Sequence, residues 1–477
     1  MTPQTAGTTV DVLVIGGGPV GENVAQYAVE GTDLTCAILE RELLGGECSY
    51  YACMPSKALL RPIDVARAAA QLPGISTPRL EPESLLARRD DWVSHYDDAG
   101  QVSWAEGAGL RVLRGHGRLV GEREVEVEAA DGTSTRVRAR RAVVLATGSV
   151  PVVPEPLRDL APWTSRDATG VQEVPAQLLI VGGGVVAVEA ATWMAALGAQ
   201  VRMLVRGETL LTGLEPAAGR HVLEALRSLG VEVELGAEVV SASREAVEDT
   251  GLGRIHGGGV TVQVRDADAT REITANEILV ATGRRPRLDD VGLEAVGLAP
   301  ENVLAGLLPA WLHAVGDASG EAPLTHWGKY RARVIGQEIR AAATGEAVEP
   351  RPTAVPVPQV VFTDPQVAAV GLTEREARGQ GVDVVTAEVP YGAAAGTALL
   401  RDDVTGTAKI VVDTRTGVLC GATFVGPEAA ELVHAATVAI VGRVPVHVLR
   451  HAVPSYPAAS ELWLRLLEEL PRELRAG

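Results

Sequence analysis

The sequence lacks several features that would place it in other classes of protein. It has no stretch of about 20 apolar residues, so we expect no transmembrane helix. The segment 1–9 has no charged region followed by an apolar core, so it does not predict a signal peptide, and we expect a cytoplasmic protein. Excess positive charge is also missing. The net charge of -18 argues against nucleic acid and against anionic membranes as partners.

Aromatic residues and cysteines are scarce. With only 2 Phe in 477 residues, the cores must be built largely from Val, Leu, Ile and Ala, and the length indicates two to four domains. Of the 4 cysteines, Cys36 and Cys420 lie in apolar runs, and we expect both to be buried strand residues without chemistry. Cys48 and Cys53 differ from these two, because cytosolic disulfides are usually catalytic or redox-sensing.

What the sequence does contain is a dinucleotide-binding pattern. The apolar run Val10–Ile15 ends in a glycine loop, a helical pattern follows, and a second apolar run ends in an acidic residue. In such a unit the pyrophosphate binds at the helix N-terminus, and the acidic residue accepts hydrogen bonds from the ribose. The alternative is a tight turn without a ligand, but the strand before the loop and the helix after it favour binding. The expected contacts are Gly16, Gly18, Pro19, Gly21 and Glu40.

The pattern occurs a second time, after the apolar run Leu178–Val181. The second strand of this unit ends in Val205, and Arg206 follows where the first unit has an acidic residue. A cation beside the ribose suits a 2′-phosphate, so the sequence favours NADP(H) over NAD(H). Alternatively, Arg206 is only a surface charge. The expected nucleotide contacts are Gly182, Gly184, Ala187 and Arg206.

Two apolar segments, 142–148 and 277–283, end in the same Ala-Thr-Gly tripeptide, in which glycine allows a sharp turn. We expect each segment to close the nucleotide-binding unit before it and to place Thr147, Gly148 and Gly283 beside the nucleotides. A Pro-rich stretch, 350–358, marks a boundary to a third, α+β domain that has no glycine loop. The expected domains are 1–150 with 276–348, then 151–275, and finally 349–477.

Cys48 and Cys53 carry the most specific chemical signal. They are five residues apart and enter a helical pattern, so they can close a small strained disulfide. The helix N-terminus would stabilise a thiolate. A zinc site would need further ligands nearby, and the neighbouring sequence offers none, so we predict no metal.

Together these motifs resemble the pyridine nucleotide–disulfide oxidoreductase family, which includes dihydrolipoamide dehydrogenase, glutathione reductase, mercuric reductase and soluble transhydrogenase. The resemblance covers essentially the whole chain. It implies that the first unit binds FAD, that Cys53 is the flavin-side, charge-transfer thiol and that Cys48 is the interchange thiol. Lys57 would pair with Glu189 beside the flavin. Further FAD contacts would be Gly46, Gly316 and Asp317, although Asp317 could also cap a helix.

The resemblance also implies the architecture. We expect an α/β protein with two Rossmann-like dinucleotide-binding domains and a C-terminal α+β dimerisation domain. The chain would form a homodimer in which the C-terminal segment of each chain faces the disulfide of the other. Tyr456 and Glu461 lie in that segment, and each active site would borrow them from the partner subunit.

The chain departs from the family at Tyr456. Disulfide reductases of the family carry a His there, just before a Pro, as the acid–base for thiol exchange, held by a Glu five residues later. Here Glu461 is present but Tyr456 replaces the His, and the spacing back to His434 has no gap. A His shuttles protons near neutral pH, whereas a Tyr with a pKa of about 10 is a poor base. His451 lies nearby but is out of register.

We therefore expect electrons to pass from NADPH through FAD and the Cys48–Cys53 disulfide to a small-molecule acceptor: a quinone, a metal ion or a small disulfide. One alternative is dihydrolipoamide dehydrogenase or another low-molecular-weight disulfide reductase, and Tyr456 counts against it. Another is a soluble transhydrogenase, which would share the Tyr but lack the cysteine pair. A non-catalytic flavoprotein is also conceivable, yet no nucleotide-binding motif is lost.

Overall fold

The computed structural model describes residues 8–476 except 267–268, 349 and 353–354. Part of the polar segment 1–9 and part of the Pro-rich stretch 350–358 therefore lie outside the described residues. The chain divides into two compact units, each described by itself. The first consists of Met1–Pro55, Arg89–Val152 and Arg284–Arg351, and the second of Ser56–Arg88, Val153–Gly283 and Pro352–Gly477. The finer boundaries expected from the sequence remain a prediction.

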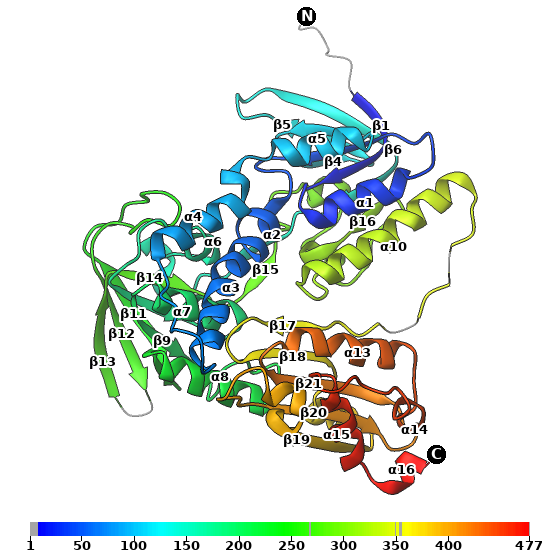
Figure 1. Cartoon of the computed structure of the whole chain (residues 1–477). Helices are drawn as coiled ribbons and strands as arrows, with labels where there is room; N and C mark the ends of the chain where they lie inside the picture. The colour runs from blue at the N-terminus through cyan, green and yellow to red at the C-terminus, as the bar shows by residue number, and fades with distance from the viewer. Residues whose placement is uncertain (1–7, 267–268, 349, 353–354, 477) are drawn as a thin grey trace, which may run out of the picture. The chain divides into compact units, whose positions relative to one another are not determined.

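The first unit is built on a seven-stranded sheet with the order β3-β2-β1-β6-β5-β4, in which β16 also pairs with β6 (Figure 1). The pairs around β1, β2 and β16 are parallel, and β4 and β5 extend the sheet in antiparallel fashion. Along β1, Val12 and Val14 enter one buried cluster, whereas Leu13 and Ile15 enter another. Both faces are covered, which explains the unbroken apolar run. The strands are β1 (Thr8–Ile15), β2 (Cys36–Glu40), β3 (Arg111–Arg114), β4 (His116–Gly121), β5 (Glu124–Glu128), β6 (Ser134–Leu145) and β16 (Leu312–Ala314).

Two helices, α1 (Pro19–Val29) and α10 (Thr325–Thr344), lie side by side in this unit (Figure 1). Their contact is close because a Cβ at Gly328 of α10 would lie 2.5 Å from Cγ2 of Val20. The position of α10 is therefore fixed against the helix that follows the first glycine loop. The other elements of this unit used below are α2 (Gly46–Tyr50), β7 (Ser149–Pro151), β15 (Arg284–Pro286) and the short η4 (Gly316–Ser319).

The second unit contains the second nucleotide fold. Its parallel sheet has the order β10-β9-β8-β14, and a separate antiparallel sheet has the order β11-β12-β13. Leu178 and Ile180 of β8 pack into one buried cluster and Leu179 into another, so this strand is also covered on both faces. The elements are β8 (Gln177–Val181), α7 (Val185–Ala196), β9 (Gln200–Val205), α8 (Pro216–Ser228), β10 (Glu232–Leu235), β11 (Glu238–Arg244), β12 (Val260–Asp266), β13 (Ala269–Ala275) and β14 (Glu277–Val280).

The C-terminal part of the second unit is a five-stranded antiparallel sheet with the order β17-β18-β21-β20-β19. Its apolar side packs on two helices, α13 and α15, as the alternation of strands and helices in the sequence indicates. The elements are β17 (Gln359–Val361), β18 (Gln366–Gly371), α11 (Glu374–Gly379), β19 (Val384–Pro390), β20 (Thr407–Asp413), β21 (Leu419–Gly426), α13 (Ala429–Val441) and α15 (Glu461–Glu469).

The predicted fold class is confirmed, with one correction among the cysteines. Cys36 is buried in β2, but Cys420 in β21 is only partly buried. The pairing of β20 with β21 changes register between Val411 and Val412, beside Cys420, and such an irregularity interrupts the alternation of buried and exposed positions. Among the described residues, no helix is both long and apolar enough to cross a lipid bilayer.

Candidate functional site

The first glycine loop joins β1 to α1, whose first residue is Pro19. A Cβ at Gly16, where φ is +105°, would lie 2.3 Å from the carbonyl oxygen of Ala146, and a Cβ at Gly21 would lie 2.0 Å from the oxygen of Gly16. At Gly18, by contrast, a Cβ would have only the Cα of Gly46 within 4 Å, at 3.9 Å, among the described residues. The loop is packed from behind and open above Gly18, which fits the pyrophosphate of FAD.

Glu40, at the end of β2, is buried and held by the backbone. The N–H of Gly17 donates to its Oε2 at 2.7 Å, and the N–H of Glu42 donates to its Oε1 at 2.7 Å. Burial raises the pKa of Glu40, and the two backbone hydrogen bonds act in the opposite direction. Each carboxylate oxygen keeps a lone pair for a further hydrogen bond. The side chain is thus oriented to accept the ribose hydroxyls of an adenosine.

Asp317 lies in the first turn of η4 rather than at its N-cap, which is Val315, so the helix-cap alternative is wrong. The Oγ of Ser149 donates to Oδ2 of Asp317 at 2.5 Å, and Nε of Arg284 donates to that Oγ at 2.8 Å. The sequence does not predict Ser149 or Arg284. The only signal for Ser149 is that it directly follows Thr147-Gly148.

Thr147 and Gly148 form hydrogen bonds with another segment of the chain. The Oγ1 of Thr147 donates to the carbonyl of Arg287 at 2.6 Å, and the carbonyl of Gly148 accepts the N–H of Arg287 at 2.9 Å. These two bonds fix the turn after β6. Gly148, with φ +73°, is thereby held in a conformation that side chains disfavour. Gly316 also has a positive φ, +64°, at the start of η4.

The two cysteines of the predicted pair lie together. Cys48 belongs to α2, Cys53 is the first residue of α3 (Cys53–Ala70), and the two thiols hydrogen-bond each other. The Sγ of Cys53 lies 3.4 Å from Oγ1 of Thr325, the first residue of α10. Two helix N-termini therefore meet the pair, and both favour a thiolate. Cys53 and Thr325 are 272 residues apart, so no local pattern could predict their contact.

The pKa of the Cys48 thiol is raised, first by its hydrogen bond with Cys53, then by burial and by the Cys53 charge. Thr325, through a hydrogen bond, and Lys329, through its charge, act to lower it. Two thiolates in contact repel each other, so the pair resists losing both of its protons.

Lys57, on α3, and Glu189, on α7, form an ion pair with 2.8 Å between Nζ and Oε2. The other oxygen of Glu189 accepts the N–H of Phe362 at 2.9 Å. The Nζ of Lys57 also lies 4.8 Å from the centroid of the Phe362 ring, which is cation–π distance. Phe362 thus orients both members of the pair, although the sequence assigns it no role.

The second glycine loop, between β8 and α7, repeats the first in its backbone. A Cβ at Gly182, where φ is +134°, would lie 2.3 Å from the carbonyl oxygen of Ala281, and a Cβ at Gly184 would meet nothing within 4 Å among the described residues. Ala187 is buried in α7, and Gly283 has φ +130°. Arg206 is exposed and makes no hydrogen bond or ion pair with any described residue. Its guanidinium is therefore available to a ligand.

No hydrogen bond joins Tyr456 to Glu461 in the part of the chain that the structure describes. Tyr456 is 77% exposed and has no hydrogen-bond partner in the part of the chain that the structure describes. Glu461 is buried, and its carboxylate accepts from Arg465 at 2.8 Å and from the N–H of Ala395 at 3.2 Å. Glu461 therefore orients α15 and its surroundings, while the phenol of Tyr456 remains available to other groups.

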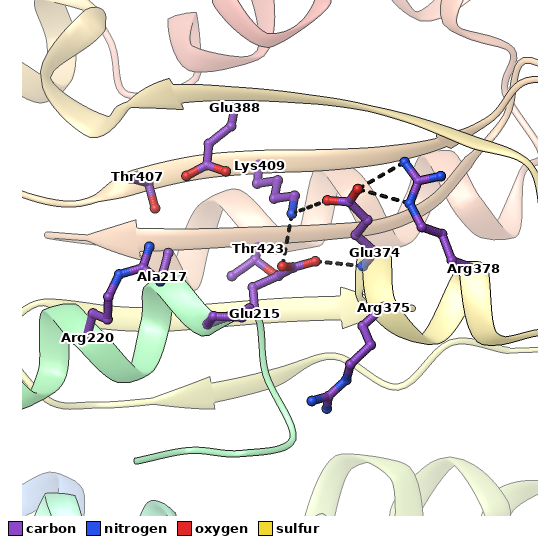
Figure 2. A pocket seen from close by; sticks show the side chains of 11 residues that line it. Glu215, Ala217, Arg220, Glu374, Arg375, Arg378, Glu388, Thr407, Lys409 and Thr423 are labelled. Atoms are coloured by element: carbon purple, nitrogen blue, oxygen red, sulfur yellow. Dashed lines mark hydrogen bonds and ion pairs between the residues drawn. The ribbon is translucent and has the colours of Figure 1, made fainter. Parts of the chain in front are cut away.

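A polar cavity of about 430 Å³ lies in the second unit, between α8 and the C-terminal sheet (Figure 2). At its centre Lys409 pairs with Glu215 at 3.0 Å and with Glu374 at 2.8 Å, and Glu215 also accepts the N–H of Glu374 at 2.7 Å. These charges satisfy one another, so the cluster joins α8 to α11 and β20. None of the predicted site residues lines this cavity.

Two models of one protein family match this chain. Residues 10–303 match the family model described as pyridine nucleotide-disulphide oxidoreductase, and residues 357–466 match the dimerisation domain of that family. A dihydrolipoyl dehydrogenase of Haloferax volcanii is 31% identical over 480 residues, which cover 97% of this chain and 96% of the relative. A mercuric reductase of Shigella flexneri is 34% identical over 459 residues, which cover 92% of this chain and 77% of the relative.

Solved structures show the same fold. LpdA from Mycobacterium tuberculosis is 24% identical with a TM-score of 0.80, covering 97% of this chain and 99% of that chain. The HOCl-induced flavoprotein disulfide reductase RclA from Escherichia coli is 21% identical with a TM-score of 0.78, covering 97% of this chain and 100% of that one. The chain belongs to the pyridine nucleotide-disulphide oxidoreductase family and is an enzyme of that family, whose members use FAD and a pyridine nucleotide.

Proposed function

We propose that the enzyme passes electrons from NADPH through FAD to the Cys48–Cys53 disulfide and from there to a small-molecule acceptor. Bound FAD would supply the two-electron chemistry that connects the nicotinamide to the disulfide. The observation that carries the proposal is the mutual contact of the two thiols at the start of α3, because a pair in contact can close a disulfide without rearranging the fold.

The thiol pair and the Lys57–Glu189 ion pair have distinct tasks in this proposal. Cys53, at a helix N-terminus and in contact with Thr325, is the flavin-side thiol, and Cys48 meets the acceptor. Lys57 supplies a fixed positive charge whose position depends on Glu189, and Phe362 holds both. Tyr456 of the partner subunit faces the thiols in place of a histidine.

The preference for NADP(H) is supported by Arg206 alone. Its guanidinium is exposed at the end of β9 and can bind a 2′-phosphate in bidentate fashion.

The homodimer is supported by the match of residues 357–466 to a dimerisation domain and by the exposed phenol of Tyr456. A cytoplasmic location fits a catalytic disulfide, because structural disulfides are rare in the cytosol.

The acceptor that we expect depends on whether the enzyme can protonate a leaving group. A disulfide acceptor releases a thiolate that must be protonated, and general acid help is typically worth about 10²–10⁴ in rate. A tyrosine or water is a weak substitute for an imidazolium at neutral pH. We therefore expect slow turnover with lipoamide and with glutathione disulfide, and faster turnover with a quinone or a metal ion.

Dihydrolipoyl dehydrogenase is the second candidate function. It is favoured by the relatives of that name, of which the one from Haloferax volcanii is 31% identical over 97% of this chain. The mercuric reductase relative, at 34% identity, supports a metal ion as the acceptor instead. A soluble transhydrogenase is disfavoured, because it would have no use for Cys48 and Cys53.

A thiol count tests the proposal independently of the acceptor. The FAD-loaded oxidised protein is mixed anaerobically with one equivalent of NADPH, and accessible thiols are counted with a chromogenic disulfide reagent after denaturation. Two new thiols per chain are expected in the wild type and none in Cys48→Ser. Equal counts before and after NADPH in the wild type would exclude the disulfide from the electron path.

A screen then separates the two candidates. NADPH and NADH are compared as donors to lipoamide, glutathione disulfide, a quinone and mercuric ion, in the wild type and in Tyr456→His. We expect Tyr456→His to raise disulfide turnover by tenfold or more and to leave the rate of thiol formation by NADPH unchanged. Wild-type lipoamide turnover as fast as thiol formation would instead favour dihydrolipoyl dehydrogenase.

A further inference from the structure

Three tyrosines lie together at the loop that carries the thiol pair. The rings of Tyr51 and Tyr96 are stacked, with 5.5 Å between their centroids and 28° between their planes. The ring of Tyr50 is tilted by 58° against that of Tyr51, with 6.3 Å between the centroids. The whole chain has only 7 Tyr and 2 Phe, so this cluster is a local concentration of a scarce residue type. Tyr50 is buried, but Tyr51 and Tyr96 are only partly buried, so the stacked pair is not simply part of a core.

Tyr51 lies in the chain between the two cysteines. Its N–H donates to the carbonyl of Glu47 at 2.8 Å, which closes the last turn of α2. Residues three positions apart on a helix are neighbours on one face, with about 5–6 Å between their Cβ atoms. Tyr51 is therefore the neighbour of Cys48 on α2, the thiol that meets the acceptor in the proposed function.

Tyr96 ends a single left-handed turn, η1 (Ser94–Tyr96), whose backbone is strained. Ser94, His95 and Tyr96 have φ values of +48°, +51° and +60°. Side chains disfavour this region, and one stacked aromatic pair returns less free energy than three such residues cost. Strain of this kind is typical of ligand sites, where it places a side chain that function requires.

A contact next to this turn fixes it to the chain that precedes α2. Oδ2 of Asp98 accepts the N–H of Leu44 at 2.6 Å and a hydrogen bond from Arg114 at 2.5 Å. The hydroxyl of Tyr96, in contrast, is buried and has no hydrogen-bond partner among the described residues. The ring of Tyr96 is therefore positioned by its backbone and by its stacking on Tyr51, and its hydroxyl is not needed for this.

We propose that the stacked rings of Tyr51 and Tyr96 form a platform that binds the flat ring of a quinone beside Cys48. This inference rests on the proposed function, in which the thiol pair reduces the acceptor, and it selects the quinone from the expected acceptors. An aromatic side chain stacks on another planar ring and tolerates different substituents on it. A metal ion or an aliphatic disulfide offers no such ring to the platform.

The reaction at this platform is a two-electron transfer from the dithiol to the quinone. The S–H bonds of Cys48 and Cys53 break, and an S–S bond forms between the two sulfur atoms. The electron pair goes to the quinone ring, and the two protons end on its two oxygens, which gives a hydroquinone. No thiolate leaves in this step, so it does not need the imidazolium that the chain lacks at Tyr456.

The test separates binding of the quinone from its reduction. Turnover with NADPH is measured for 1,4-naphthoquinone, 1,4-benzoquinone and mercuric ion, in FAD-loaded wild type, Tyr51→Leu, Tyr96→Leu and Tyr96→Phe. Leucine keeps an apolar side chain but removes the ring, whereas phenylalanine keeps the ring. Tyr330→Leu is the matched control, because Tyr330 stacks on Trp327 in the same unit with 5.4 Å between the centroids. The gain of two thiols from NADPH shows that each variant is folded and can reduce its disulfide.

We expect Tyr51→Leu and Tyr96→Leu each to raise the KM for 1,4-naphthoquinone about tenfold, the typical effect of losing one aromatic stacking partner. The kcat should change by less than about twofold, because the rings bind the quinone and take no part in the reduction. The smaller 1,4-benzoquinone should lose less, and the KM for mercuric ion should not change. Tyr96→Phe and Tyr330→Leu should keep the wild-type values.

Three outcomes would overturn the platform. They are an unchanged KM for 1,4-naphthoquinone in both leucine variants, an equal rise of the KM for mercuric ion, and wild type without quinone turnover. Full quinone turnover in Cys48→Ser would also overturn it, because the quinone would then not need the thiol pair. If wild-type protein gains two thiols from NADPH, the proposed function survives each of these results. If it gains none, the proposed function fails whatever the KM values show.

Discussion

The two glycine loops of the chain are built alike, but the residues at the end of the strand that follows each loop differ. Gly16 and Gly182 both have a positive φ, and a Cβ at either would lie 2.3 Å from a carbonyl oxygen of the neighbouring strand end. Gly18 and Gly184 both cap the following helix; among the described residues, a Cβ at Gly18 would meet only the Cα of Gly46, at 3.9 Å, and a Cβ at Gly184 would meet nothing within 4 Å. The same steric rule therefore shapes both loops, and any difference in the ligands that they bind must come from elsewhere.

The difference lies where the second strand of each unit ends. Glu40 is buried and held by two backbone amides, whereas Arg206 is exposed and has no partner among the described residues. A side chain that is fixed before binding loses little entropy on binding, which suits a cofactor that stays. A mobile side chain must be ordered each time, which suits a nucleotide that is exchanged. Glu40 is thus held in place by its own chain, whereas the described residues do not hold Arg206.

The largest expected effect comes from Gly16→Ala and Gly182→Ala, which test whether the loops serve different ligands. Each adds a methyl group against a carbonyl oxygen and forces a side chain into a positive φ, at a cost of about 3 kcal/mol or more. We expect Gly16→Ala to be purified without FAD. Gly182→Ala should keep its FAD and be reduced by NADPH at least about 100-fold more slowly.

The absorbance of FAD relative to protein and stopped-flow reduction by NADPH give these two readings. Gly31→Ala is the control, because Gly31 has φ +71° but a Cβ there would meet nothing within 4 Å among the described residues. It should cost stability without separating the two ligands. Loss of FAD from Gly182→Ala but not from Gly16→Ala would reverse the assignment of the two units.

The next largest effect tests the fixed side chain of the first unit. Glu40→Ala removes the ribose acceptor and leaves the N–H groups of Gly17 and Glu42 without their partner. A lost hydrogen bond to a charged group costs about 1.5–3 kcal/mol, so FAD should bind roughly 10–100-fold more weakly. Fluorescence titration of the apoprotein with FAD measures the change. Unaltered FAD affinity would show that Glu40 only holds its own loop.

The sequence predicts these loops well because their requirements are local. The glycines, the strand before them and the helix after them lie within a few residues, and steric clash allows few alternatives at Gly16 and Gly182. The Lys57–Glu189 pair joins residues 132 positions apart and is implied only by the resemblance to a family. For this pair the structure adds the contact itself.

Residues supplied by distant segments could not be predicted. Thr325 reaches Cys53 across 272 positions, and the N–H of Phe362 reaches Glu189 across 173 positions. No periodicity relates such residues, because the folding of the chain alone decides which helix start or loop meets the site. For Cys420 the apolar run correctly predicts a strand. Its partial burial could not be predicted, because it depends on an irregularity in the pairing of β20 with β21.

A smaller effect tests the exposed side chain Arg206 of the second unit. Arg206→Ala should lower the NADPH/NADH ratio of kcat/KM by roughly tenfold to a hundredfold, since a bidentate contact to a phosphate is worth about 1.5–3 kcal/mol. FAD content should not change. Arg220→Ala, which removes another exposed arginine of the same unit, should leave the ratio as it is. An equal ratio in wild type and Arg206→Ala would show that Arg206 is only a surface charge and does not bind the 2′-phosphate.

The smallest effect concerns Glu22, which follows Gly21 in the first loop, whereas the uncharged Val188 follows Ala187 in the second. Burial raises the pKa of Glu22 from 4.5 to about 7, so between these values the folded protein holds a proton that the unfolded chain releases. Stability must therefore fall as pH rises through this range. We expect the free energy of unfolding of FAD-saturated wild type to fall by about 1 kcal/mol more than that of Glu22→Gln between pH 5 and pH 6, where most exposed carboxylates no longer titrate. Urea unfolding at both pH values measures the difference.

Glu30→Gln, at the exposed C-terminal end of the same helix, is the control and should keep the wild-type slope. If Glu22→Gln and wild type lose stability in parallel, Glu22 is ionised in the folded protein and the first loop carries a buried charge that the second lacks.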